Sequence, residues 1–180
     1  MTEPVLSVKN LSTYFYGRTG IVKAVDGVSF DLFKGEIMGL VGESGSGKTV
    51  TGFSLIGLVD EPGRIVNGSI NLNGREIINM KTSDLRSIRG RDIAMIFQDP
   101  IATLNPVLTI GQQMKLAIAA HLKLSNKAAE DRCSDMLSKI GIPSARERLS
   151  AYPHEFSGGM RQRVAIAIAL LHHPSVIIAD

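Results

Sequence analysis

One stretch decides how this chain folds: Gly42-Glu43-Ser44-Gly45-Ser46-Gly47-Lys48-Thr49. It has the pattern G-x-x-x-x-G-K-[ST] and lies between an apolar run, Ile37-Met38-Gly39-Leu40-Val41, and residues 50–58, whose spacing suits a helix. The pattern predicts a buried strand, a phosphate-binding loop and a helix, in that order. We call residues 42–49 the phosphate loop. The plain alternative is a Gly/Ser-rich turn that carries an exposed lysine.

The residue types of the phosphate loop indicate what it binds. Its glycines allow backbone conformations that side chains forbid, so that successive N–H groups can form a concave nest for phosphate oxygens. The helix that follows adds free N–H donors and a partial positive charge at its amino end. Lys48 would reach the β- and γ-phosphates, and the Thr49 hydroxyl would bind Mg²⁺. Every loop position, including Glu43, Ser44 and Ser46, is a predicted nucleotide contact.

Length and composition predict one domain with a core of its own. The chain has 180 residues, of which 44% are hydrophobic and 21% are charged. No apolar run reaches the roughly 20 residues that cross a bilayer, and the amino terminus lacks a secretory signal. Cys133 is the single cysteine, so no disulfide framework is possible, which suits a reducing compartment. We therefore expect a cytoplasmic location.

Charge does not point to nucleic acid. The net charge is +3, but the basic residues are scattered, apart from a trio that we interpret as solvated surface: Arg86, Arg89 and Arg91. Aromatic residues make up 5% and tryptophan is absent, so a base-stacking platform is not expected. The four histidines have no metal-ligand spacing, and we interpret them as surface or cap residues.

The remaining chain predicts strands in its first part. Alternating runs predict strands at residues 5–9, 22–32 and 65–72, the first of them at a sheet edge. Asn73-Gly74 is typical of a hairpin turn. Residues 93–97 predict a further apolar strand, stopped by Pro100.

Helices are predicted mainly in the second part. Residues 83–88 suit a short helix capped by Thr82 or Ser83. Residues 109–122 and 126–140 have helical periodicity, and no strand pattern occurs between Asn105 and His173. Another helix begins at Ser157 and carries an apolar stripe: Met160, Val164, Ile168 and Leu171. A buried strand at residues 176–179 then precedes Asp180.

Three further positions carry candidate chemistry. Asp180 follows an apolar strand, where an enzyme with a phosphate loop holds an acidic residue for Mg²⁺. Gln98 also follows a strand, so that its side chain could touch a bound metal or water. Ser157-Gly158-Gly159 opens a helix and resembles a second anion site, because Ser157 can cap and the glycines leave N–H groups accessible. Taken singly, a surface aspartate, a loop glutamine and a capped helix are the plain alternatives.

Together these motifs resemble the ATP-binding subunits of ABC transporters. Residues 42–49 resemble the Walker A loop, Gln98 the Q-loop glutamine and residues 176–180 Walker B. Phe156-Ser157-Gly158-Gly159-Met160-Arg161-Gln162 is similar to the ABC signature, with Phe for the usual Leu and Met for the usual Gln. Three segments are similar to the oligopeptide/dipeptide/nickel importer branch: Phe97-Gln98-Asp99-Pro100, Leu104-Asn105-Pro106 and Tyr152-Pro153-His154-Glu155-Phe156.

The resemblance implies a fold and a set of ligands. The fold is α/β: a P-loop NTPase (RecA-like) core with an N-terminal antiparallel β-subdomain, at residues 1–97 and 174–180, and a helical subdomain at 98–173. ATP and Mg²⁺ are the implied cofactors, with Lys48, Gln98 and Asp180 in catalysis and Thr49, Gln98 and Asp180 at the metal. Phe15 matches the aromatic that stacks on adenine, with Tyr16 as runner-up; a packed aromatic of the β-subdomain is the plain alternative.

The resemblance also implies partners. Two ATP-binding subunits, identical or different, form a head-to-tail dimer, in which each ATP touches Walker A of one subunit and the signature, Ser157 to Gly159, of the other. The subunit lies on the cytoplasmic face of the inner membrane as a peripheral protein, beside transmembrane permease subunits and, indirectly, a substrate-binding protein. The implied function is to power import of short peptides or a related small solute.

Two alternatives remain open. One is a soluble ABC ATPase without a membrane partner, and the other is a truncated product that binds nucleotide without hydrolysis. The family's catalytic Glu, its D-loop and its switch histidine would follow Asp180, and we expect the C-terminal part of the core to be missing here. Residues 1–180 alone are therefore predicted to lack ATPase activity.

Overall fold

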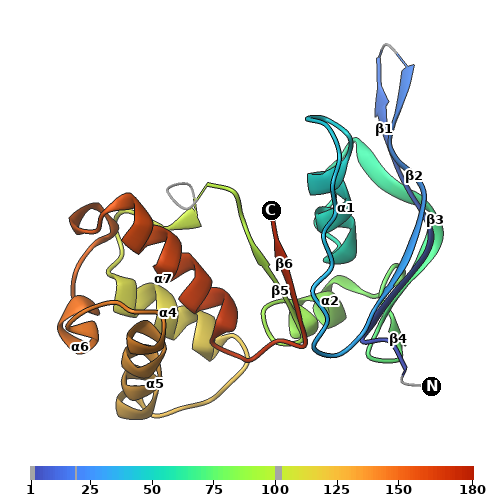
Figure 1. The fold of residues 1–180 in the computed structure, drawn as a ribbon. Helices are drawn as coiled ribbons and strands as arrows, with labels where there is room; N and C mark the ends of the chain where they lie inside the picture. Colours follow the sequence, from blue (N-terminus) through green and yellow to red (C-terminus); the bar gives the residue numbers. More distant parts are fainter. Residues whose placement is uncertain (1–2, 19, 100–102) are drawn as a thin grey trace. The chain divides into compact units, whose positions relative to one another are not determined.

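The structure is a computed structural model that describes residues 3–18, 20–99 and 103–180. The chain forms two compact units, Met1–Arg89 with Asp180 and Gly90–Ala179 (Figure 1). Pro100, which the sequence predicts as the end of a strand, lies outside the described residues. The division into functional subdomains at residue 98 stays a prediction.

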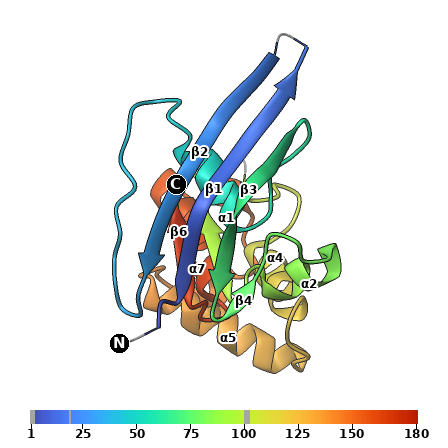
Figure 2. The same ribbon diagram turned by 90° about the vertical axis from the view of Figure 1, so that its right-hand side faces the viewer.

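A four-stranded antiparallel sheet forms the body of the first unit (Figure 2). Its strand order is β2-β1-β3-β4, with β1 at Leu6–Gly17, β2 at Gly20–Leu32, β3 at Gly63–Leu72 and β4 at Arg75–Glu76. The predicted hairpin turn is confirmed, because Asn73 and Gly74 take positive φ values of 50° and 81° between β3 and β4.

The edge position predicted for the first strand is wrong. β1 pairs with β2 on one side and with β3 on the other, and its Leu6, Val8 and Leu11 are at most 1% exposed. The alternating pattern of residues 5–9 marks one buried face, which central and edge strands of a one-sided sheet share. The pattern therefore identifies a strand without fixing its neighbours.

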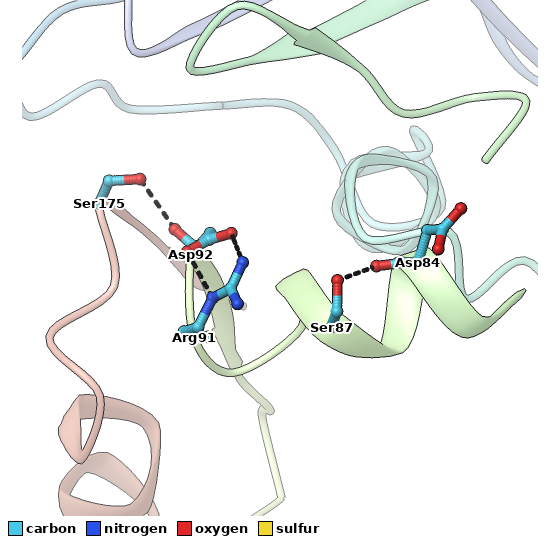
Figure 3. A network of polar contacts seen from close by, with 5 residues as sticks. All are labelled: Asp84, Ser87, Arg91, Asp92 and Ser175. Carbon is cyan, nitrogen blue, oxygen red and sulfur yellow. Dashed lines mark hydrogen bonds and ion pairs between the residues drawn. The ribbon is translucent and has the colours of Figure 1, made fainter. Parts of the chain in front are cut away.

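Helix α1, Lys48–Leu55, contacts β1 and β2 of this sheet. A second helix, α2, spans Thr82–Ile88 and has Lys81 as its N-cap residue, with extended φ and ψ of −62° and 150°. The predicted cap at Thr82 or Ser83 is wrong because both residues already lie inside the helix. Within α2, the Ser87 hydroxyl donates to the Asp84 carbonyl at 2.7 Å (Figure 3).

The apolar run before the phosphate loop does not form the predicted buried strand. Ile37 is 98% exposed and Val41 is 90% exposed, and no described residue pairs with residues 37–41 in either sheet. A parallel strand needs hydrogen-bond partners along its edges and cover on both faces. Hydrophobicity alone cannot supply these partners, so the segment remains unpaired and exposed among the described residues.

The second unit contains a parallel pair of strands, β5 at Ile93–Ile96 and β6 at Val176–Ala179. The carbonyl of Asp92, just before β5, holds the start of β6. It accepts hydrogen bonds from the Ser175 hydroxyl at 2.9 Å and from the backbone N–H groups of Ser175 and Val176. Arg91 pairs with the Asp92 carboxylate (Figure 3). Both segments thus form strands, as predicted, but the predicted burial of residues 176–179 is wrong: Val176 is 3% exposed, whereas Ile177 is 45% exposed.

Helices form most of the second unit between Asn105 and His173, where the sequence predicts helices and no strand. They are α4 (Ile110–Ala119), α5 (Asn126–Lys139), α6 (Ala145–Arg148), the 3₁₀ turn η1 (Pro153–Glu155) and α7 (Gly158–Leu170). Thr109 caps α4 through a capping box with Gln112, and Ser125 caps α5. Cys133 is fully buried in their shared core, and burial raises the pKa of its thiol to about 11.

Candidate functional site

The phosphate loop leads directly into the amino end of α1. Gly47 is the N-cap residue, with a left-handed φ of 91°, and it offers no side chain to cap the first turn of the helix. The first-turn N–H groups of an α-helix have no intrahelical acceptors, so an anion suits this position. The loop thus presents backbone donors and a helix dipole, as the sequence predicts.

Gly47 is also required by a close approach. A Cβ at this position would lie 2.1 Å from the carbonyl oxygen of Ala24 on β2. Together with the positive φ, this contact excludes any side chain. Because Gly47 has no side chain, the amino end of α1 can lie directly against β2.

The Lys48 side chain folds back over the loop. Its Nζ donates to the carbonyls of Gly42 at 2.8 Å and Glu43 at 2.7 Å. The Ser46 N–H donates to the same Glu43 carbonyl at 3.2 Å, which closes a turn inside the loop. The amine is thereby held against two carbonyls of the phosphate loop.

Thr49 and Asp180 are brought together. The Thr49 hydroxyl lies 3.0 Å and 2.9 Å from the two carboxylate oxygens of Asp180 and donates to that carboxylate. Both residues are exposed. Hydroxyl and carboxylate oxygens are ligands that Mg²⁺ prefers, and the phosphates of a nucleotide commonly complete its coordination.

The residues present therefore fit a magnesium nucleotide. No group of three or more His, Cys, Asp or Glu within residues 3–18, 20–99 and 103–180 could hold a metal by itself.

The second predicted anion site lies at the start of α7, in the second unit. Ser157 is the N-cap residue and its Oγ accepts from the Met160 N–H at 3.4 Å. A Cβ added at Gly158 or Gly159 would meet nothing within 4 Å, so the backbone there is open to an approaching group. The predicted cap and accessible backbone are both present.

Two arginines in the first turns of α7 have backbone acceptors of their own. Arg161 Nε donates to the Phe156 carbonyl at 3.0 Å, and Arg163 donates to the Gly141 carbonyl at 3.0 Å. Their charges are therefore directed to these carbonyls, and they give no separate indication of an anion. Phe156, which replaces the usual signature Leu, is 2% exposed and belongs to the helical core.

Gln98 and Phe15 occupy different surroundings. Gln98 is exposed and follows β5 in the second unit, whereas Lys48 belongs to the first. Phe15 is half-buried near the end of β1, and its ring lies over Gly63 of β3, where a Cβ would be 2.5 Å from its Cε1. The neighbouring Tyr16 ring faces the Arg64 guanidinium, 4.1 Å from its centroid. Their roles toward ATP stay predictions.

Sequence reasoning missed residues that hold α1 in place. Thr13 and Ser54 join β1 to α1 through buried hydroxyls, 2.8 Å apart.

Arg86 and Arg91 are exposed, as the surface interpretation of the arginine trio predicts, but that interpretation is wrong for Arg89. Arg89 is half-buried and donates to backbone carbonyls 32 and 33 residues away. Such contacts leave no periodic or spacing signal.

In the part of the chain that the structure describes, no helix has the length and hydrophobicity needed to cross a membrane.

Comparison with known proteins shows which proteins the chain resembles in fold and in sequence. The fold matches the dimeric structure of MJ0796, a bacterial ABC transporter cassette, with a TM-score of 0.84 and 26% identity over 97% of this chain and 73% of that one. The dipeptide transport ATP-binding protein DppD of Bacillus subtilis is 50% identical over 99% of this chain and 53% of its own length. The oligopeptide transport ATP-binding protein OppD of Escherichia coli is 47% identical over 99% of this chain and 52% of its own length.

The chain thus spans about half the length of the curated relatives it matches. The family model described as "ABC transporter" matches residues 25–180, which include the phosphate loop, the start of α7 and Asp180. With the phosphate loop, the Thr49–Asp180 contact and the cassette fold all present, this chain belongs to the ABC transporter family.

Proposed function

We propose that this chain is the nucleotide-binding part of an ATP-hydrolysing subunit that powers peptide import. The observation that carries the proposal is the contact of the Thr49 hydroxyl with both carboxylate oxygens of Asp180, beside the Lys48 amine folded over its loop. The names of the relatives, which are transport ATP-binding proteins for dipeptides and oligopeptides, support the transport role.

The residues of the first unit divide the work at the nucleotide. The N–H groups of the loop and of the first turn of α1 bind phosphate oxygens, and Lys48 adds a positive charge. Thr49 and Asp180 hold Mg²⁺ through their side-chain oxygens. Bound MgATP supplies the phosphoanhydride bond whose hydrolysis releases the free energy for transport. Phe15 stacks on adenine. Gln98, which belongs to the second unit, is proposed to contact the metal or the attacking water.

The start of α7 serves a second subunit. Ser157 is exposed at the N-cap, and the space above Gly158 and Gly159 is open, so backbone donors can meet a phosphate that approaches from outside. Two ATP-binding subunits arranged head to tail would place this surface against the nucleotide of the other. Dimeric cassettes with this fold support such an arrangement.

Substrate choice belongs to partners. The proposed location is the cytoplasmic face of the inner membrane, beside transmembrane permease subunits that receive solute from a binding protein. This subunit would then supply energy without contacting the peptide. Exchange of this subunit for a relative from another peptide importer should leave substrate range unchanged, and a changed range would contradict the division of labour.

The nucleotide site is tested by Lys48→Ala in the full chain. Loss of a charge-assisted contact with two phosphates should abolish ATP binding or weaken it severely, as measured by calorimetry. Lys34→Ala is the matched control, because Lys34 is exposed in the turn after β2 and lies outside the loop. Unchanged ATP affinity in Lys48→Ala would remove the basis of the proposal.

The transport role is tested separately. The subunit should co-purify with membrane permease subunits from its own cells, and Lys48→Ala should block peptide uptake without preventing that association. A subunit that binds ATP but never associates with a permease would instead act as an ABC ATPase without a membrane partner. The lack of ATPase activity expected for residues 1–180 alone stays a prediction.

A further inference from the structure

The Arg89 side chain reaches the carboxyl end of α1, whose amino end carries the phosphate loop. Arg89 Nε donates to the Ile56 carbonyl at 2.7 Å, and one of its terminal amino groups donates to the Gly57 carbonyl. A single planar guanidinium thus binds two consecutive carbonyls, a geometry that lysine cannot reproduce.

The backbone closes the preceding part of this helix end. Gly57 N–H donates to the Ser54 carbonyl at 3.1 Å and Leu58 N–H to the Phe53 carbonyl at 2.8 Å, with Gly57 at a positive φ of 63°. This is the Schellman pattern, which satisfies carbonyls one turn inside the helix. The carbonyls beyond that turn point to Arg89, and α1 has no basic residue in its own last turn. Arg89 therefore supplies the cation that favours the negative end of the helix dipole.

The guanidinium fits closely between two helices. A Cβ at Gly57 would lie 3.2 Å from the Arg89 amino group and 3.2 Å from Leu85 Cδ1. Arg89 is also the C-cap residue of α2, and its N–H donates to the Leu85 carbonyl at 3.0 Å. Arg89 therefore ends α2 and also binds the carboxyl end of α1, which fixes the position of one helix relative to the other.

Two further contacts hold α1 to the sheet. The helix has 8 residues, which corresponds to a length of about 12 Å. Its amino end is seated against the Ala24 carbonyl through Gly47, and Ser54 in its last turn is bonded to Thr13 of the sheet. A rigid helix held at two points can still turn about the line that joins them, and the two carbonyl contacts of Arg89 oppose this turning. Such a turn would move the N–H donors at the amino end.

We propose that Arg89 is a positioning residue for nucleotide binding, which acts through α1 on the phosphate loop and touches no nucleotide itself. This inference rests on the proposed function, since it takes residues 42–49 as the phosphate site. It assigns a role in ligand affinity to a residue that lies at the far end of the helix from the ligand.

The test measures ADP affinity by calorimetry in the full chain, at a temperature where every variant is folded. Arg89→Gln should weaken ADP binding by about threefold to tenfold. Arg89→Lys keeps the charge but loses the two-carbonyl geometry, so its affinity should lie between that of Arg89→Gln and the wild type. ADP serves as the probe because it lacks the γ-phosphate that a second subunit would contact.

Arg132→Gln is the matched control. Arg132 Nε donates to the Leu171 carbonyl at 2.9 Å, so it holds the carboxyl end of α7 as Arg89 holds that of α1. Both Arg→Gln variants should lower the melting temperature, but only Arg89→Gln should weaken ADP binding. Equal loss of affinity in both variants, or an unchanged affinity in Arg89→Gln, would overturn the inference.

Amide hydrogen exchange separates this inference from the proposed function. If the wild type binds no ADP, the proposed function fails, and exchange at residues 42–51 then decides the role of Arg89. These amides should exchange faster in Arg89→Gln than in Arg132→Gln. Equal exchange in the two variants would show that Arg89 does not position the loop.

Discussion

The hydroxyl of Thr13 on β1 lies 2.8 Å from the hydroxyl of Ser54 on α1, and the two residues are 0% and 1% exposed in the interior of the first unit. Ser54 donates its own proton to the Val50 carbonyl at 2.7 Å. The Thr13 hydroxyl is therefore the donor in the pair. One hydrogen bond thus ties the helix of the phosphate loop to the central strand of the sheet.

This direction predicts unequal effects of removing the two partners. Ser54→Ala leaves a buried donor on Thr13 and should lower the free energy of unfolding by about 1–3 kcal/mol. Thr13→Val leaves only an acceptor lone pair, since Ser54 still donates to Val50, and should cost about 1 kcal/mol. Urea unfolding of the full chain measures both values. The double variant should lose less free energy of unfolding than the two single variants lose together. Strictly additive losses would contradict a hydrogen bond between the two hydroxyls.

A comparison of two loop glycines separates backbone strain from close contact. Gly45 and Gly47 have φ values of 81° and 91°, but only at Gly47 would a Cβ meet another atom, the Ala24 carbonyl oxygen at 2.1 Å. Gly45→Ala should cost about 1 kcal/mol of strain, while Gly47→Ala should displace the amino end of α1 and weaken ATP binding far more. Calorimetric ATP titration and thermal unfolding of both variants test this order. A larger loss of affinity in Gly45→Ala would reverse it.

Ser157→Arg should separate binding by one subunit from assembly of two. Ser157 and Lys48 belong to different units, so ATP binding at the phosphate loop should be retained. A bulky cation at the exposed N-cap should block ATP-driven dimerisation in a hydrolysis-deficient background, as measured by sedimentation. Ser157→Ala is the control, since it removes the cap at a cost of about 1 kcal/mol without adding bulk. Normal dimerisation of Ser157→Arg would disprove the role in the second subunit.

His172 predicts a dependence of stability on pH. Burial lowers the pKa of His172 below its ordinary value of 6.5, neighbouring His121 and Arg132 lower it further, and a hydrogen bond to the Ala117 carbonyl opposes part of the shift. The unfolded chain therefore binds more protons, so that stability is retained above pH 6.5 and is lost as the pH falls below it.

The measurement compares the urea midpoints of unfolding at pH 8 and pH 5.5 in the wild type and in His172→Gln, because the difference between the two pH values reports the shifted pKa through proton linkage. The wild type should lose more stability on acidification than the variant does. His154→Gln is the control, because the His154 ring is exposed and stacked on Tyr152. An equal loss in the wild type and His172→Gln would contradict the shift.

The features that the sequence could predict are local. Asn73-Gly74 adopts the positive φ values of its turn, Thr109 and Ser157 cap the helices that follow them, and the G-K-[ST] pattern places Lys48 at the start of α1. In each case the residue and its partner lie within a few positions, so the signal and its cause are contained in the same short window.

The features that the sequence could not predict depend on distant partners. Residues 37–41 are as apolar as a buried strand, but a strand exists only where another strand offers hydrogen bonds, and none of the described residues offers them. The alternation at residues 5–9 could not show that β1 has neighbours on both sides. Arg89 resembled a surface cation because the carbonyls that it holds are 32 and 33 residues away.

The contact between Thr49 and Asp180 can form only late in synthesis of the protein, because it joins residues 131 positions apart. A ribosome that adds about 5–20 residues per second needs roughly 7–26 seconds to make the chain between them. During that interval the phosphate loop already has its lysine but lacks its carboxylate. A nascent chain can therefore gain affinity for phosphate before it gains the residue proposed to hold Mg²⁺, and the metal site is completed only when Asp180 has been added.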